Sequence, residues 1–158
     1  MQFKKKDPKR KTFKEAVLIT EDIKECYQKG LQGLRENRNK IVLQNRLECG
    51  GSVEIDDCTA KKYPNNNRWD YVFDYKGEVF FMEVHSASTS EVRTVLRKFQ
   101  WLIDWLNQNA PELNNLKSKN KTAFYWVQSG DYKILKNSRQ ERAIVQMGLK
   151  PVSRIMLN

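Results

Sequence analysis

The stretch that decides the fold is residues 68–85, RWDYVFDYKGEVFFMEVH. β-Branched and aromatic residues fill both arms, and Lys76-Gly77 stands between them, where a two-residue hairpin loop needs positive φ. This loop length sets the pairing of the two strands and places Asp70 directly opposite Glu83. A three-residue loop would shift the pairing by one and send Asp70 to the other face, whereas a four-residue loop centred on the same turn would keep it.

Two carboxylates, those of Asp70 and Glu83, would therefore face each other across the hairpin. Like charges in such positions destabilise a sheet, so we expect a positive charge between them, and a hard divalent cation with oxygen ligands is the first candidate. His85 shares the face of Glu83 because side chains alternate along a strand, and Arg68 would lie opposite His85. The alternative is an ordinary hairpin whose acids lie at a solvated edge.

Both faces of the hairpin are apolar. One face carries Val72, Val79 and Phe81, and the other carries a larger set, Trp69, Tyr71, Phe73, Phe80, Met82 and Val84. Strands of this kind are usually covered on both sides. Acids inside such strands, rather than at their tips, need a partner because burying an unpaired charge is costly.

The bulk composition indicates one domain. The chain has 158 residues, of which 39% are hydrophobic and 30% are charged. No apolar run approaches the roughly 20 residues of a membrane span, and no signal-peptide pattern follows the first methionine. We therefore expect no membrane partner and a cytoplasmic location.

The net charge of +10 is concentrated at the N-terminus, where residues 1–14 hold seven basic side chains against Asp7 alone, a net +6. We expect a flexible basic arm over 1–14 and a single domain over 15–158. The alternative for the arm is a solubilising tail without a partner. A basic arm is attracted to the phosphate backbone of nucleic acid, here through Lys4, Lys5 and Lys6.

The three cysteines are Cys26, Cys49 and Cys58, and they form no C-x-x-C pair. Because His85 is the only histidine, a structural zinc site is not expected. We expect the cysteines to be small buried apolar residues in a reducing compartment. No G-x-S-x-G, P-loop or dinucleotide glycine pattern occurs, although His85 leaves a Ser-His-Asp or Cys-His hydrolase open.

Capping signals and apolar periodicity predict the other elements. Helices are expected from Thr12, over 21–41, from Ser88 to Pro111, and from Ser138 to Gly148. Strands are expected over 52–58, 122–128 and 151–157, with loops over 63–67 and 114–121. The resulting order is α-β-β-β-α-β-α-β, an α/β fold.

This order, with Asp70 on the second strand and Glu83-Val84-His85 on the third, resembles the PD-(D/E)XK nuclease superfamily over roughly residues 20–128. The resemblance implies a restriction-endonuclease-like α-β-β-β-α-β core, with a mixed sheet flanked by helices. Here a C-terminal helix and strand would be added to that core. It also implies that Asp70 and Glu83 are metal ligands, with the carbonyl of Val84 as a possible third, and acids suit Mg²⁺ or Mn²⁺.

The main departure from this family is His85, which stands where members have a lysine that positions or activates the attacking water. A histidine could play either part, or it could mark lost activity. Some members supply the missing cation from the following helix, where Lys98 is the candidate. Members also often carry a further acid on the first helix, for which Glu25 and Glu36 are candidates, and Asp74 is a second possible ligand.

The implied activity is metal-dependent hydrolysis of phosphodiester bonds in DNA or RNA, by an endonuclease or an exonuclease. On the helix after the hairpin, Trp101 and Trp105 share an outward flank beside Arg97 and Lys98. This pattern suits base stacking or a protein interface, unless the C-terminal segment covers both rings. Arg68, Arg97 and Trp101 join the arm lysines as candidate nucleic-acid ligands.

A second function fits the same sequence. It is a catalytically degenerate protein of the same fold that binds nucleic acid or a protein partner, or that forms a homodimer. The two functions differ in whether Asp70 and Glu83 bind a metal ion. A basic RNA-binding protein of another fold is a more distant third.

Overall fold

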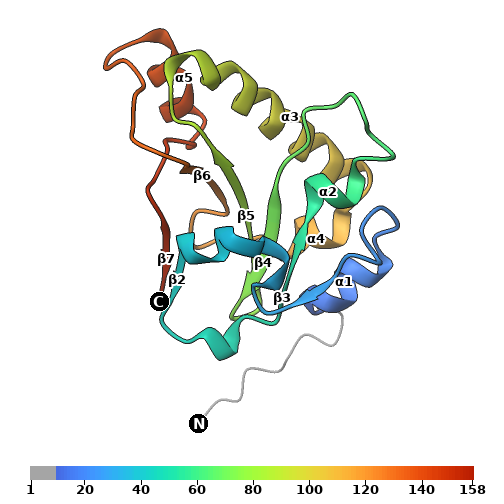
Figure 1. Ribbon diagram of the computed structural model, residues 1–158. Helices are drawn as coiled ribbons and strands as arrows, with labels where there is room; N and C mark the ends of the chain where they lie inside the picture. The colour runs from blue at the N-terminus through green and yellow to red at the C-terminus, as the bar shows by residue number, and fades with distance from the viewer. Residues whose placement is uncertain (1–9) are drawn as a thin grey trace.

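A computed structural model describes residues 10–158, and the predicted hairpin lies at its centre (Figure 1). β4 (Tyr71–Tyr75) and β5 (Glu78–His85) are antiparallel, and Lys76-Gly77 joins them. Both loop residues have positive φ, 51° at Lys76 and 78° at Gly77, as a two-residue loop requires. The strands pair from Tyr75 opposite Glu78 to Tyr71 opposite Met82, so the predicted register is confirmed.

The hairpin belongs to a mixed five-stranded sheet. Its order is β1 (Gln28–Lys29), β3 (Gly51–Glu54), β4, β5 and β6 (Phe124–Gln128). Neighbours are antiparallel up to β5, and β6 runs parallel to β5. The connection from β5 to the parallel β6 carries the longest helix, as a crossover between parallel strands does. The predicted α/β class and the mixed sheet flanked by helices are confirmed.

Three helices cover one face of the sheet: α1 (Phe13–Ile19), α3 (Val92–Gln108) and α4 (Pro111–Leu116). The apolar stripe of α3 packs on Val72, Val79 and Phe81 of the hairpin. α1 starts at the capping box that the sequence predicts, because the Thr12 hydroxyl accepts a hydrogen bond from the Glu15 amide at 3.2 Å. This layer places one helix, α3, directly over the face that carries the acids.

The opposite face is covered by the 3₁₀ helix η1 (Gln32–Lys40) and by a small parallel sheet of β2 (Ile41–Leu43) and β7 (Ile155–Leu157). Figure 1 shows β2 and β7 side by side. Their inward residues share a core cluster with Phe73, Phe80 and Met82 of the hairpin. Both faces of the hairpin are therefore covered, as its double apolar pattern predicts.

The C-terminal part adds a helix and the strand β7, as expected. α5 (Arg139–Gln146) begins where the Ser138 hydroxyl accepts a hydrogen bond from the Glu141 amide at 3.0 Å. It ends before Gly148, whose φ of +68° is the left-handed conformation of a glycine cap. Ile144 of α5 joins the core cluster under α3.

The predicted long helix over 21–41 is wrong. The segment holds turns, β1 and η1 instead. Gly30 has φ +53°, and a Cβ on Gly33 would lie 2.8 Å from Ser52 Oγ. The two glycines therefore serve a tight turn and a close backbone approach, and both interrupt a helix whose apolar spacing is otherwise regular.

Three smaller expectations also need correction. The strand predicted over 52–58 ends at Glu54, and α2 (Ile55–Thr59) follows it. The loop predicted over 114–121 begins with the last turn of α4. The side chain of Ser88 makes no capping hydrogen bond, and a short 3₁₀ turn, η3 (Thr89–Glu91), precedes α3.

A further turn, η2 (Arg46–Glu48), precedes β3. Each helix in the described part of the chain, residues 10–158, is too short or too polar to span a lipid bilayer.

Candidate functional site

Asp70 and Glu83 lie side by side, and each is fixed by the backbone of the other's strand. The Asp70 amide donates to Glu83 Oε2 at 2.9 Å, and the Val84 amide donates to Asp70 Oδ2 at 3.0 Å. One oxygen of each carboxylate is thereby occupied. The remaining oxygens, Asp70 Oδ1 and Glu83 Oε1, converge on one position.

The ammonium group of Lys98 occupies that position. Its Nζ lies 3.6 Å from Asp70 Oδ1 and contacts Glu83 Oε1 directly. Lys98 comes from α3, on the flank of the apolar stripe that faces the sheet. The positive charge expected between the two acids is thus present in the chain itself.

The three charged groups are largely shielded from water. The exposed fractions of their side chains are 0% for Glu83, 17% for Lys98 and 18% for Asp70. Burial and the neighbouring Asp70 raise the pKa of Glu83 well above its ordinary value. Burial also raises the pKa of Asp70, although Lys98 opposes that shift. Burial alone would lower the pKa of Lys98, but the two carboxylates outweigh it and raise that pKa.

His85 lies at the rim of this cluster, between two acids. Its Nε2 is 2.8 Å from Glu91 Oε2, and its Nδ1 is 3.8 Å from Glu83 Oε1. Glu91 lies in the short 3₁₀ turn η3 before α3, and its carboxylate orients the imidazole. Glu91 is thus a site residue that sequence reasoning missed, and its position six residues after His85, across a turn, gives little signal.

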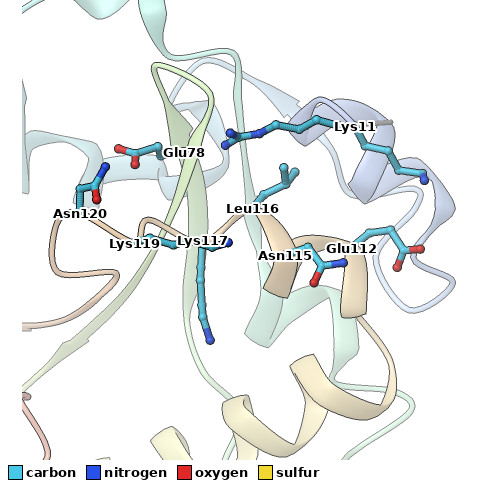
Figure 2. Close-up of a pocket in the computed structure, with 9 residues that line it drawn as sticks. Lys11, Glu78, Glu112, Asn115, Leu116, Lys117, Lys119 and Asn120 are labelled. Carbon is cyan, nitrogen blue, oxygen red and sulfur yellow. The ribbon is translucent and has the colours of Figure 1, made fainter. Parts of the chain in front are cut away.

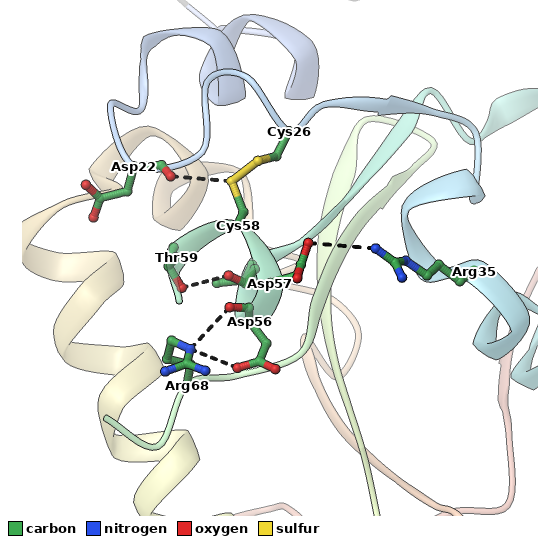
Figure 3. Close-up of a disulfide and its surroundings, with 9 residues drawn as sticks. Asp22, Cys26, Arg35, Asp56, Asp57, Cys58, Thr59 and Arg68 are labelled. Carbon is green, nitrogen blue, oxygen red and sulfur yellow. Dashed lines mark hydrogen bonds and ion pairs between the residues drawn. A yellow bond between two sulfur atoms is a disulfide. The ribbon is translucent and has the colours of Figure 1, made fainter. Parts of the chain in front are cut away.

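Arg68 holds the loop before β4. Its Nε donates to Asp56 Oδ1 at 2.9 Å, and its Nη1 donates to the carbonyl of Tyr63 at 2.7 Å. Figure 3 shows Arg68 beside α2, which carries Asp56. The guanidinium therefore ties the chain entering Asp70 to α2.

A disulfide lies on the same side of the molecule (Figure 3). Cys26 and Cys58 are bonded, with their Cα atoms 6.2 Å apart. The expectation of three unpaired cysteines is wrong for this pair, which lies 32 residues apart in the chain. It holds for Cys49, which is free and buried, and burial raises the pKa of its thiol to about 12.

The two tryptophans of α3 are packed rather than outward. The rings of Trp101 and Trp105 stack with centroids 5.7 Å apart, and Tyr63 meets Trp101 edge-on. Trp105 is 3% exposed, and its Nε1 donates to Asp22 Oδ2 at 3.0 Å. The loop before β4, and not the C-terminal segment, covers these rings.

The other acidic candidate ligands lie elsewhere. Asp74 accepts a hydrogen bond from the Gly51 amide at 2.6 Å, near the turn end of the hairpin. Glu25 and Glu36 are exposed and lie outside α1. Val84 pairs with Val127 of β6. Within residues 10–158, no group of three or more acidic, histidine or cysteine side chains is arranged to hold a metal ion.

The donor set nevertheless suits Mg²⁺ or Mn²⁺. Mg²⁺ is commonly held by only one or two carboxylates, with water and substrate phosphate completing its shell. Asp70 Oδ1 and Glu83 Oε1 supply two convergent oxygens, and both still face a cation, Lys98. A metal ion would compete with that ammonium for the same two oxygens.

Other basic residues bear on the predicted nucleic-acid contacts. Arg97 is exposed on α3, whereas Lys4, Lys5 and Lys6 lie outside the described residues. A cleft of about 440 Å³ opens at the turn end of the hairpin. Figure 2 shows its basic side chains together with two acids, Glu78 and Glu112.

Comparisons of the chain with protein-family profiles, curated proteins and solved structures find no match. Functional inference therefore depends on the residues themselves.

Proposed function

We propose that this protein is a metal-dependent nuclease that hydrolyses phosphodiester bonds. The observation that carries the proposal is the convergence of Asp70, Glu83 and Lys98 on one point at the open end of the hairpin. Two acids and a lysine are the chemistry of a PD-(D/E)XK site. Here the lysine comes from α3 rather than from the strand that carries Glu83. The order α1, β3, β4, β5, α3, β6 supports the same proposal.

Each residue has a separate role in this proposal. Asp70 and Glu83 would hold Mg²⁺ or Mn²⁺, which when bound polarises the scissile phosphate and lowers the pKa of a water molecule. Lys98 supplies positive charge to the phosphate. Because its pKa is raised, it stays protonated and does not act as a base. His85, oriented by Glu91, is the candidate base that takes the proton of the attacking water.

The alternative function is a catalytically degenerate protein of the same fold that binds nucleic acid or a protein partner. The ion pairs of Lys98 with both carboxylates favour it, because they neutralise part of the acidic charge without a metal ion. Among residues 10–158, no third acidic, histidine or cysteine side chain joins Asp70 and Glu83 in a group arranged to hold a metal ion, which points the same way. The two functions make opposite predictions for cleavage.

The test is a cleavage assay on single- and double-stranded DNA and RNA with Mg²⁺ or Mn²⁺. Glu83→Gln and Lys98→Met should each reduce the rate at least about a hundredfold, the usual loss when one charge-stabilising group is removed. Glu48→Gln and Lys61→Met replace exposed residues of the same types and should retain activity. Circular dichroism would establish that each variant is folded.

The two possible failures mean different things. Folded wild-type protein that cuts none of the substrates would favour the degenerate alternative. Cleavage that survives in both Glu83→Gln and Lys98→Met would place the activity outside this cluster and overturn the proposal.

A further inference from the structure

We propose that the groove between α3 and α5 binds a single strand of nucleic acid leading away from the candidate site. This inference rests on the proposed function and extends it to the substrate. The groove encloses about 410 Å³. Its principal lining residues are Arg93, Leu96, Arg97 and Gln100 from α3, with Arg139 and Ala143 from α5.

The groove concentrates positive charge that the protein itself does not neutralise. Arg93, Arg97 and Arg139 line it together, and no carboxylate lines it with them. Among residues 10–158, no carboxylate oxygen lies within 4.0 Å of a guanidinium nitrogen of these three arginines. Asp104, one turn beyond the groove on α3, accepts a hydrogen bond from Gln100 at 3.0 Å. The arginine charge therefore remains available to an anion.

The position of the arginines on α3 strengthens this argument. Arg93 and Arg97 are four residues apart, so they lie on one ridge of the helix, where like charges destabilise it. Arg139 adds a third positive charge from the neighbouring helix. A bound polyanion would offset this repulsion, and guanidinium groups suit phosphate because they donate paired hydrogen bonds in one plane.

The shape of the groove favours one strand over a duplex. Its floor is made by partly buried apolar side chains, Leu96 and Ala143, between the charged rims. An apolar floor between charged rims suits a single strand, because its unpaired bases can lie on that floor, whereas the bases of a duplex are turned inward. Phosphates would contact the arginines, and bases could lie on the apolar floor or stack on guanidinium planes.

The groove is also connected to the candidate site through α3. Lys98 faces Asp70 and Glu83, and Arg97, the residue before it, points about 100° away around the same helix. Arg93 lies one turn earlier on the ridge of Arg97. A strand that leaves the site and crosses α3 would therefore meet Arg97 and then the groove. The cleft in Figure 2 is at the other end of the hairpin and contains two acids.

The test measures binding of labelled 20-nucleotide DNA and RNA single strands by fluorescence anisotropy, in EDTA and over a range of salt concentrations. The variant is Arg93→Gln, Arg97→Gln and Arg139→Gln combined. A charge-matched control combines Lys11→Gln, Lys117→Gln and Lys119→Gln in the other cleft. We expect the groove variant to bind roughly tenfold more weakly or worse, and to lower the salt slope by about 2 to 3. The control should change both far less.

An equal or larger loss of affinity in the control would show that the strand is held by the total charge of the protein or by the other cleft. That result would overturn the inference. Absence of binding by wild-type protein would overturn it as well. An equal loss for a 20-base-pair duplex would overturn the assignment to a single strand. Because binding is measured without metal, groove-dependent binding with no cleavage in the nuclease assay would support this inference and reject only the proposed function.

Discussion

Asp22 is a carboxylate that three side chains hold in place. Its side chain is 3% exposed, and it accepts hydrogen bonds from Lys62 at 2.5 Å, Tyr63 at 2.7 Å and Trp105 at 3.0 Å. Burial would raise the pKa of Asp22, but these three partners outweigh it and lower that pKa. The carboxylate thereby fixes the loop before β4 against α3. That loop leads to Asp70 of the candidate site, and α3 carries Lys98.

Asp22→Asn should reduce the free energy of unfolding by about 1–3 kcal/mol at pH 7, because it removes charge-assisted hydrogen bonds. A carboxyl whose pKa is lower in the folded state stabilises above its unfolded pKa, and this stabilisation is lost as the pH falls through the folded value. The deficit of Asp22→Asn should therefore shrink at about pH 3. Urea unfolding at both pH values measures it, with the exposed Asp131→Asn as control. An equal deficit at both would show that the charge is not the cause.

Residue by residue, the candidate site was partly predictable. Alternation and loop length were enough to bring Asp70 and Glu83 together, because both are local properties of one hairpin. The position of Lys98 depends on the angle at which α3 crosses the sheet. Helical phase alone places Lys98 only at the margin of the apolar stripe of that helix. The pairing of His85 with Glu91 depended on the turn η3, which capping rules do not describe.

At the scale of elements, the turn between β4 and β5 controls the register on which the site depends. Gly77 has φ +78°, a left-handed conformation that costs a residue with a Cβ about 1–2 kcal/mol. A Cβ at Gly77 would meet nothing within 4 Å, so steric contact adds no further cost. The conformational penalty can thus be measured by itself.

Gly77→Ala should lower the free energy of unfolding by about 1–2 kcal/mol. The matched control is Gly130→Ala, which also has free space around its Cβ but no positive φ, and it should be neutral or slightly stabilising. Thermal and urea unfolding of the two variants would measure the difference. Similar stabilities for both would contradict a strained turn.

Elements with strong local signals were predicted well, and the others were not. The hairpin, α1, α3 and α5 carry a turn, a cap or a long apolar stripe within one stretch of sequence. The segment 21–41 has helical apolar spacing, but its packing against β3 requires Gly33 to approach Ser52 closely. That requirement comes from a neighbouring strand and is not visible in the segment itself.

At the scale of the whole molecule, the C-terminus closes the second face of the sheet. Ile155 of β7 is 1% exposed, whereas its neighbour Met156 is 71% exposed. Ile155 pairs with Ile41 of β2 in the small parallel sheet. The sequence predicts β7 as a strand, but the pairing of β7 with β2 joins segments near opposite ends of the chain and has no local signal.

Ile155→Ala should therefore destabilise the whole domain by about 2–5 kcal/mol, the usual cost of removing a large buried apolar side chain. Met156→Ala should change stability by no more than about 0.5 kcal/mol. Denaturant unfolding followed by tryptophan fluorescence measures both. If Ile155→Ala proved as mild as Met156→Ala, β7 would not be part of the cooperative core.

The bond between Cys26 and Cys58 closes a covalent ring around the segment that holds β1, η1, β2, η2 and β3. A single protease cut between residues 27 and 57 would open the backbone without releasing a fragment, because the sulfur bridge still joins the two pieces. On a denaturing gel, the nicked protein would migrate as one species without reductant and as two with it.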